Sequence, residues 1–166
     1  MIIVAALIWK IGPSFAFMDQ GYHGNNIISG DKWGINITEI SDIEKTGDAT
    51  LIGEISTIGT TLNFNATLFH PGDKLSFNIT VSNTSLLKAE LYAMTLAGLS
   101  NNDSEYITYT ILPIDSSMIH TDSQNGSIIK SGEEQVFNIT VKYDNNAKID
   151  QEYNLGLGST IIYRQV

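Results

Sequence analysis

Apolar and polar residues alternate along most of the chain, and this period of two is the feature that most restricts its fold. The five residues FNITV occur twice, at 77–81 and 137–141, and a related INIT runs from 35 to 38. Each copy has its apolar residues on one side and Asn and Thr on the other, which is typical of a strand buried on one face. On this basis the expected strands are 33–38, 49–55, 62–68, 75–81, 87–97, 106–111, 137–143 and 153–163.

Turn signals separate these segments. The clearest is HPGD at residues 70–73, because Pro fixes φ and Gly permits a positive φ. Residues 87–97 also fit helical spacing, and we expect a strand there because the neighbouring segments are strands. Residues 113–127 form a long polar connection. The pattern predicts an all-β fold, a single jelly-roll or Ig-like β-sandwich of about eight or nine strands.

The composition agrees with this fold class and excludes some functions. Only 16% of the 166 residues are charged, so Asn, Ser and Thr must supply much of the polar surface. The net charge of −9, with no cluster of Lys and Arg, argues against a nucleic-acid partner. The chain has no cysteine, which excludes disulfides, thiolate catalysis and Cys-ligated metals.

The N-terminus indicates export. Residues 2–9, IIVAALIW, are continuously apolar but too short to span a membrane, and Ser14 and Ala16 suit a signal-peptidase site after residue 16. No basic residue precedes the apolar run, so either the start is truncated or the run is a buried first strand. We expect a signal peptide at 1–16, a flexible mature segment at 17–31 and the sandwich at 32–166.

Catalytic motifs are missing from the sequence. His23, His70 and His120 are far apart in expected loops, and no H-E-x-x-H, G-x-S-x-G or phosphate-binding loop occurs. Residues 144–150 faintly resemble a calcium loop but lack its Gly and Glu, so we expect an acidic hairpin turn. Gly156-Leu157-Gly158 lies inside a strand, where close packing or a bulge explains it better than ligand binding. We therefore assign no catalytic, metal or cofactor-binding residue.

Asn-x-Ser/Thr triplets can be read as glycosylation acceptors at seven positions: Asn36, Asn65, Asn78, Asn83, Asn102, Asn125 and Asn138. Four of these, Asn36, Asn65, Asn78 and Asn138, fall in the middle of expected strands, where they are the outward residues of the alternation. The loop positions stay open.

Several short motifs resemble the TasA/camelysin-type secreted proteins. They are Asp31-Lys32-Trp33, the stretch ATLFHPGDKLSFNITVSNTSLLKAEL at 66–91, and EEQVFNITVKYDN with the closing IIYRQ. The residues that match the family pattern are Trp33, Pro71, Gly72, Asp73, Asn83, Ala89 and Leu91. The resemblance spans nearly the whole chain, and its motifs are mostly structural.

The resemblance implies a jelly-roll domain, exported with the help of a signal peptidase to the cell surface or biofilm matrix. It implies a non-enzymatic fibre subunit whose N-terminal segment is donated as a strand to another copy or to a paralogous subunit. We place the donor within residues 19–37, with Asn25, Asn26, Ile27 and Ile28 as the candidate polymerisation segment. Camelysin has been classed as a metallopeptidase, but this sequence shows no ligand set for that chemistry.

An alternative is a monomeric adhesin or carbohydrate-binding module on the same fold. Exposed aromatic side chains on one sheet face would favour it, and the tyrosines to inspect are Tyr92, Tyr106, Tyr109 and Tyr163. We expect these tyrosines to complete the core or a sheet edge instead, because tyrosine is common in strands. A metal-dependent peptidase would require the histidines to converge with carboxylates.

Overall fold

The computed structural model describes residues 27–28, 34–115 and 127–166. Eleven strands and one short 3₁₀ helix, η2 (Asp103–Glu105), lie in these residues. The strands are β1 (Ile27–Ile28), β2 (Ile35–Ile40), β3 (Glu44–Thr46), β4 (Thr50–Ile58), β5 (Thr61–Leu68), β6 (Lys74–Asn83), β7 (Ala89–Ala97), β8 (Ile107–Pro113), β9 (Ile128–Ile129), β10 (Glu134–Tyr143) and β11 (Tyr153–Gln165).

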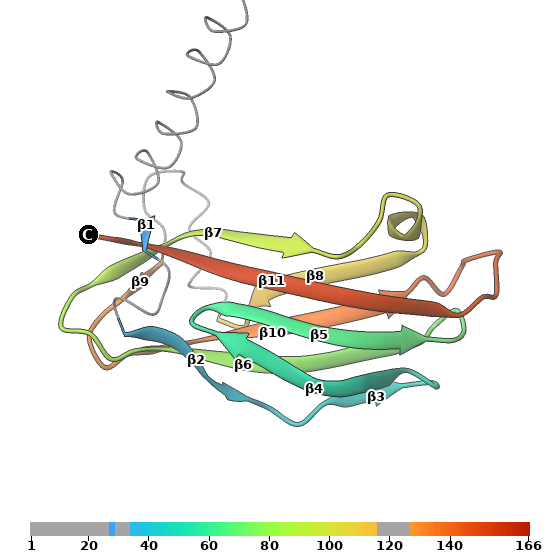
Figure 1. Cartoon of the computed structure of the whole chain (residues 1–166), viewed down its shortest axis with the longest axis horizontal. Coiled ribbons are helices and arrows are strands. Elements are labelled where there is room, and N and C mark those ends of the chain that lie inside the picture. Colours follow the sequence, from blue (N-terminus) through green and yellow to red (C-terminus); the bar gives the residue numbers. More distant parts are fainter. Residues whose placement is uncertain (1–26, 29–33, 116–126) are drawn as a thin grey trace, which may run out of the picture.

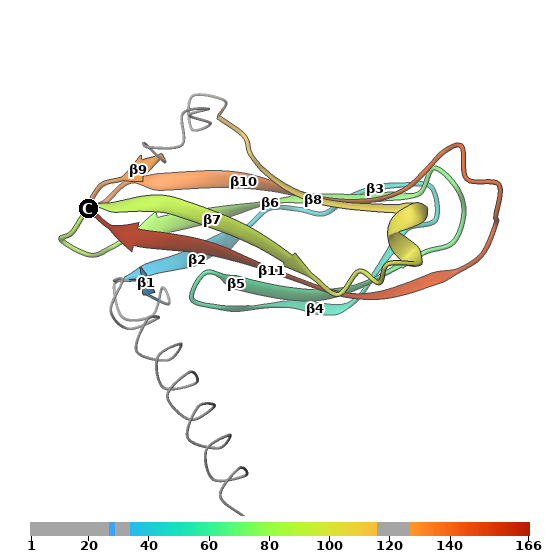
Figure 2. The same cartoon turned by 90° about the horizontal axis from the view of Figure 1, so that it is seen from above.

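The strands form two antiparallel sheets that pack against each other. The six-stranded sheet has the order β4-β5-β11-β7-β9, and β1 pairs with β11 outside this path. The five-stranded sheet has the order β2-β6-β10-β8, and β3 pairs with β6. Figures 1 and 2 show an elongated sandwich with the C-terminus, β1 and β9 at one end and η2 at the other. The predicted all-β sandwich is confirmed.

The two FNITV copies lie side by side in the five-stranded sheet. They belong to β6 and β10, which pair antiparallel with Phe77 opposite Ile139 and Ile79 opposite Phe137. All four of these side chains are buried between the sheets. Each side chain of this size stabilises the fold by roughly 1.5–3 kcal/mol when fully buried. The repeat is therefore a pair of central core strands, as its alternation indicates.

The polar residues of the repeat form a hydrogen-bonded row on the outer face. Asn78 and Asn138 lie directly opposite each other, and Asn138 Nδ2 donates to Asn78 Oδ1 at 2.9 Å. Asn138 Oδ1 in turn accepts a hydrogen bond from Thr140 Oγ1 at 2.8 Å. Such cross-strand polar pairs contribute roughly 0.2–1 kcal/mol each.

The predicted strand positions agree with the structure, while the count was too low. Of the expected strand 87–97, residues 89–97 form a strand, β7, and not a helix. The expected eight or nine strands omit β1, β3 and β9, which have only two or three residues and so show no alternation. Asn36, Asn65, Asn78 and Asn138 lie within strands, as expected.

Candidate functional site

β1 adds a short strand to the six-stranded sheet beside the C-terminal end of β11 (Figure 1). β5 pairs with β11 only as far as Thr160. Beyond that point β1 pairs antiparallel with Tyr163 and Arg164, while β7 occupies the other side of the same residues. β1 therefore lies on the side of β11 that β5 leaves free.

The first residue of β11 that receives β1 is anchored in the core. Tyr163 is 4% exposed, and its hydroxyl donates to Gln135 Oε1 of the opposite sheet at 2.7 Å. Gln135 Nε2 then donates to Ser127 Oγ at 2.8 Å. Burial raises the pKa of Tyr163 far above its ordinary value, so the phenol stays a neutral donor. This chain of hydrogen bonds links the two sheets below the docking edge.

The second residue of β11 that pairs with β1, Arg164, is held by side chains of the neighbouring strand β7. Arg164 Nε donates to Glu90 Oε2 of β7 at 2.6 Å, and the guanidinium lies 5.3 Å from the centroid of the Tyr92 ring. The hydrogen bond with Glu90 raises the pKa of Arg164 above its ordinary value. The side chains of Tyr163 and Arg164 therefore both hold this end of β11 in position beside β1.

The PGD motif builds a turn at the opposite end of the sandwich. Gly72 has a φ of +99°, which few other residues adopt without strain. Asp73 is 3% exposed, and its carboxylate accepts the backbone N–H groups of Phe69, His70 and Asp48 at 2.8, 3.1 and 3.0 Å. Asp73 therefore ties the β5–β6 turn to the β3–β4 turn.

Electrostatics at Asp73 follow from these contacts. Burial alone would raise the pKa of the carboxyl group, but the N–H groups of Phe69, His70 and Asp48 together outweigh burial and hold the pKa below its usual range. The carboxylate is consequently ionised over the whole neutral range. Its role is structural, and no bound group is needed to explain it.

Asn83, the last residue of β6, also joins separate backbone segments by side-chain hydrogen bonds. Its side chain is fully buried, and Nδ2 donates to the carbonyl oxygens of Leu87 and Ile129 at 2.8 and 3.1 Å. Its Oδ1 accepts the N–H of Ser85 at 3.0 Å. Burial and these bonds make Asn83 unsuitable as a glycosylation acceptor, whereas Asn102 lies exposed beside η2.

The remaining family-motif residues that the structure describes are also structural. Ala89 is buried and Leu91 is partly buried against the core, both on β7. Pro71 lies in the turn before Gly72. Asn25 and Asn26 of the candidate polymerisation segment, and Trp33 of the family motif, lie outside the described residues, as do His23, His120 and Asn125.

His70 contacts two carboxylates at the PGD end. Its Nδ1 lies 2.8 Å from Asp150 Oδ1, and its Nε2 lies 3.9 Å from Asp48 Oδ2. The hydrogen bond and charge of Asp150 raise the pKa of His70 above 6.5. Within the described part of the chain, no group of three or more His, Cys, Asp or Glu side chains is placed to hold a metal ion.

The tyrosines do not form an aromatic binding surface. Tyr109 and Tyr163 are buried, and Tyr106 packs partly against the core, as expected for residues that complete it. Burial raises the pKa of Tyr109 to about 12. Tyr92 is 54% exposed but is covered on one side by Arg164.

Sequence reasoning missed Arg164 and Glu90, whose pairing depends on the register of β7 against β11. It also assigned Gly156-Leu157-Gly158 to close packing or a bulge, and gave no role to Asn63, which lies opposite Gly158 on β5. The available signal for this site was glycine at outward positions of one expected strand and asparagine at outward positions of another.

The chain matches no protein family model, no curated protein and no solved structure. In the regions that the structure describes, none of the helices has the length and apolar character to cross a membrane.

Proposed function

We propose that the chain is a secreted structural protein of the cell surface or biofilm matrix, and that it assembles into fibres by donating its N-terminal strand to a neighbouring subunit. The observation that carries the proposal is the pairing of Ile27–Ile28 with the free side of β11. The export-like start of the sequence and the family resemblance support the same function.

Strand exchange requires little change in bonding at this edge. An N-terminal strand from a second copy can form the same backbone hydrogen bonds with β11 that β1 forms within one chain. The internal strand has only two residues, fewer than the usual five or six, so it provides few bonds to hold the segment in place. A donated strand would also keep this sheet edge paired, which matters because an unpaired edge favours aggregation.

Donation in this arrangement is head-to-tail. The donor segment and the acceptor edge of β11 are different surfaces, so each subunit that receives a strand still has its own strand to give. Contacts of this type do not close unless the rotation between subunits produces a ring, and they generate filaments. The backbone of Tyr163 and Arg164 forms the acceptor edge, and the buried hydroxyl bond of Tyr163 to Gln135 holds this edge in place for an incoming strand.

The experiment is to express residues 17–166 and to examine the purified protein by electron microscopy and size exclusion. We expect fibres or high-mass oligomers. Deletion of residues 17–30 should leave a folded monomer with the same far-ultraviolet circular dichroism. If the shortened chain still forms the same fibres, strand donation is wrong.

A matched pair of proline variants refines the test. Ile28→Pro removes a backbone N–H from β1, and Ile128→Pro removes one from β9, which is also a two-residue Ile-Ile strand on the same sheet. We expect loss of fibres for Ile28→Pro alone. Equal loss in both variants would indicate a general effect of weakening the sheet edges.

A further inference from the structure

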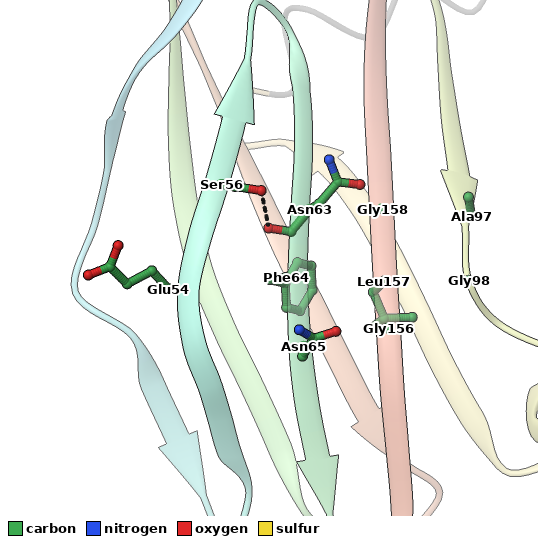
Figure 3. A pocket seen from close by; sticks show the side chains of 10 residues that line it. All are labelled: Glu54, Ser56, Asn63, Phe64, Asn65, Ala97, Gly98, Gly156, Leu157 and Gly158. Atoms are coloured by element: carbon green, nitrogen blue, oxygen red, sulfur yellow. Dashed lines mark hydrogen bonds between the residues drawn. The ribbon is translucent and has the colours of Figure 1, made fainter.

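A groove lies on the outer face of the six-stranded sheet, away from the edge that receives β1 (Figure 3). Its volume is about 350 Å³, at the small end of the roughly 300–1,000 Å³ range of small-molecule sites. β11 forms its floor, and β4, β5 and the end of β7 form its sides. The lining residues are Glu54, Ser56, Asn63, Phe64, Asn65, Ala97, Gly98, Gly156, Leu157 and Gly158.

The floor carries no side chain of β11 itself, because two outward positions of this strand are glycines. Gly156 lies opposite Asn65 and Gly158 opposite Asn63. A Cβ at Gly156 would meet Asn65 Oδ1 at 3.3 Å, and one at Gly158 would meet Asn63 Oδ1 at 2.9 Å. These nearest atoms are the ends of flexible side chains, so close backbone packing does not require glycine at either position. The two glycines instead leave space beside β11 into which the flexible amide ends of Asn63 and Asn65 extend.

The amide groups of Asn63 and Asn65 are available to a ligand. Neither side chain has a hydrogen-bond partner among the described residues, and both are exposed. Other outward amides on the same molecule are engaged, as in the Asn78–Asn138 pair. Figure 3 shows both free amides directed toward the glycine strand.

The interior of the groove offers no charge. Glu54 is the charged residue among those lining it, and in Figure 3 its carboxylate is directed away from β11. The net charge of −9 would also repel an anionic ligand. Each amide carries both a donor and an acceptor, which suits hydroxyl groups that also donate and accept. The glycine backbone adds no side chain to the floor, so the C–H face of a sugar ring can approach it once the flexible amides turn toward the hydroxyl groups.

We propose that the groove over Gly156 and Gly158 binds a neutral saccharide, with the side-chain amides of Asn63 and Asn65 bonding its hydroxyl groups. This site is separate from the β1 edge, so it acts whether or not the chain polymerises. Binding of this kind would connect a matrix protein to the neutral glycans around it.

The test uses the full chain and three neutral tetrasaccharides, maltotetraose, cellotetraose and chitotetraose, titrated separately and followed by amide chemical shifts, in solution for the monomer and by magic-angle-spinning spectra for fibres. We expect at least one to shift the resonances of Asn63, Asn65, Gly156 and Gly158 with a Kd of about 1 mM or below. If none of the three binds below about 10 mM, or if the shifts cluster elsewhere, the proposal is overturned.

Variants separate binding from folding. Asn63→Ala with Asn65→Ala should weaken binding at least about tenfold, equivalent to about 1.4 kcal/mol. Gly156→Val fills the floor with a residue that favours strands, and it should weaken binding without lowering the unfolding midpoint. The control is Asn36→Ala, another outward mid-strand amide, on the five-stranded sheet. Unchanged affinity in the double variant would contradict the proposal.

Discussion

Replacement of Asp73 should cost the fold a large part of its stability. The carboxylate accepts three backbone N–H groups, at 2.8, 3.0 and 3.1 Å, from two different turns. Hydrogen bonds to a charged group contribute roughly 1.5–3 kcal/mol each, although such values do not add fully. Asp73→Ala leaves all three donors without this acceptor, so we expect a loss of about 3–5 kcal/mol in the free energy of unfolding.

Asp73→Asn should lower the free energy of unfolding by less than Asp73→Ala does. The amide keeps one oxygen acceptor but presents an NH₂ group where the second oxygen stood, so at least one of the three N–H groups loses its partner. We expect a loss of about 2–3 kcal/mol. Since domains are stable by roughly 5–15 kcal/mol, both variants should be clearly separated from the wild type in urea titrations near neutral pH.

The pH dependence gives a second readout. The folded pKa of Asp73 lies below its ordinary value of 3.8, so its contribution is present above that value and is lost as the pH falls through the folded pKa. The stability difference between the wild type and Asp73→Asn should therefore shrink on acidification from about pH 7 to about pH 3. The control is the exposed Asp42→Asn, which we expect to change stability by less than about 0.5 kcal/mol. If Asp73→Ala costs no more than this control, the capping argument is refuted.

Four further variants, with Gly53→Ala as the control for Gly98→Ala, test local features of the sandwich. Gly98→Ala should lower the free energy of unfolding by about 2–4 kcal/mol in urea titrations, because φ is +95° and a Cβ would collide with a carbonyl oxygen of β11. Gly53→Ala should lower it by only about 1 kcal/mol, because φ is +71° but the space around the Cβ is open. Tyr143→Phe should lose about 1–2 kcal/mol in the same assay, because the buried ring loses a 2.6 Å hydrogen bond from its hydroxyl to a backbone carbonyl. His70→Gln should lower the thermal unfolding midpoint more at about pH 5.5 than at about pH 8.5. The hydrogen bond and ion pair with Asp150 raise the pKa of His70 in the folded state, so His70 stabilises the fold at low pH and this stabilisation is lost as the pH rises through the folded pKa. The argument for Gly98 would be wrong if both glycine variants lost equal stability. The argument for Tyr143 would be wrong if Tyr143→Phe left the stability unchanged, and that for His70 if the effect of His70→Gln did not depend on pH.

The long strands were predictable because their signal is local. In β6 and β10 the inward residues are apolar or aromatic except Asn83 and Gln135, and most outward residues are polar, so the sequence alone shows which face is buried. The short strands carry no such signal. Glu44, Lys45 and Thr46 of β3 are all exposed, and only their pairing with β6 makes them a strand.

The candidate sites depend on long-range register, which the sequence does not reveal. The groove requires Asn63 to lie opposite Gly158, and the docking edge requires β5 to end before Tyr163. Asp73 was predictable as a turn residue, but its bond to the backbone of Asp48 was not, because that contact joins two separate turns.

The central claim is that the N-terminal strand of one chain pairs with β11 of another, and introduced cysteines test it directly. Ile27 and Arg164 are register partners. Residues directly opposite each other in antiparallel strands are typically about 4.5–5.5 Å apart between Cα atoms, which a disulfide can span. The chain has no cysteine of its own, so each introduced thiol is unique.

Chains of residues 17–166 with Ile27→Cys are mixed with chains carrying Arg164→Cys, allowed to assemble, oxidised and separated without reductant. We expect a disulfide-linked heterodimer, identified by mass spectrometry of the 27–164 peptide. The control partner carries Ser104→Cys, an exposed position at the other end of the sandwich. A heterodimer yield with Arg164→Cys no higher than with Ser104→Cys would contradict strand donation.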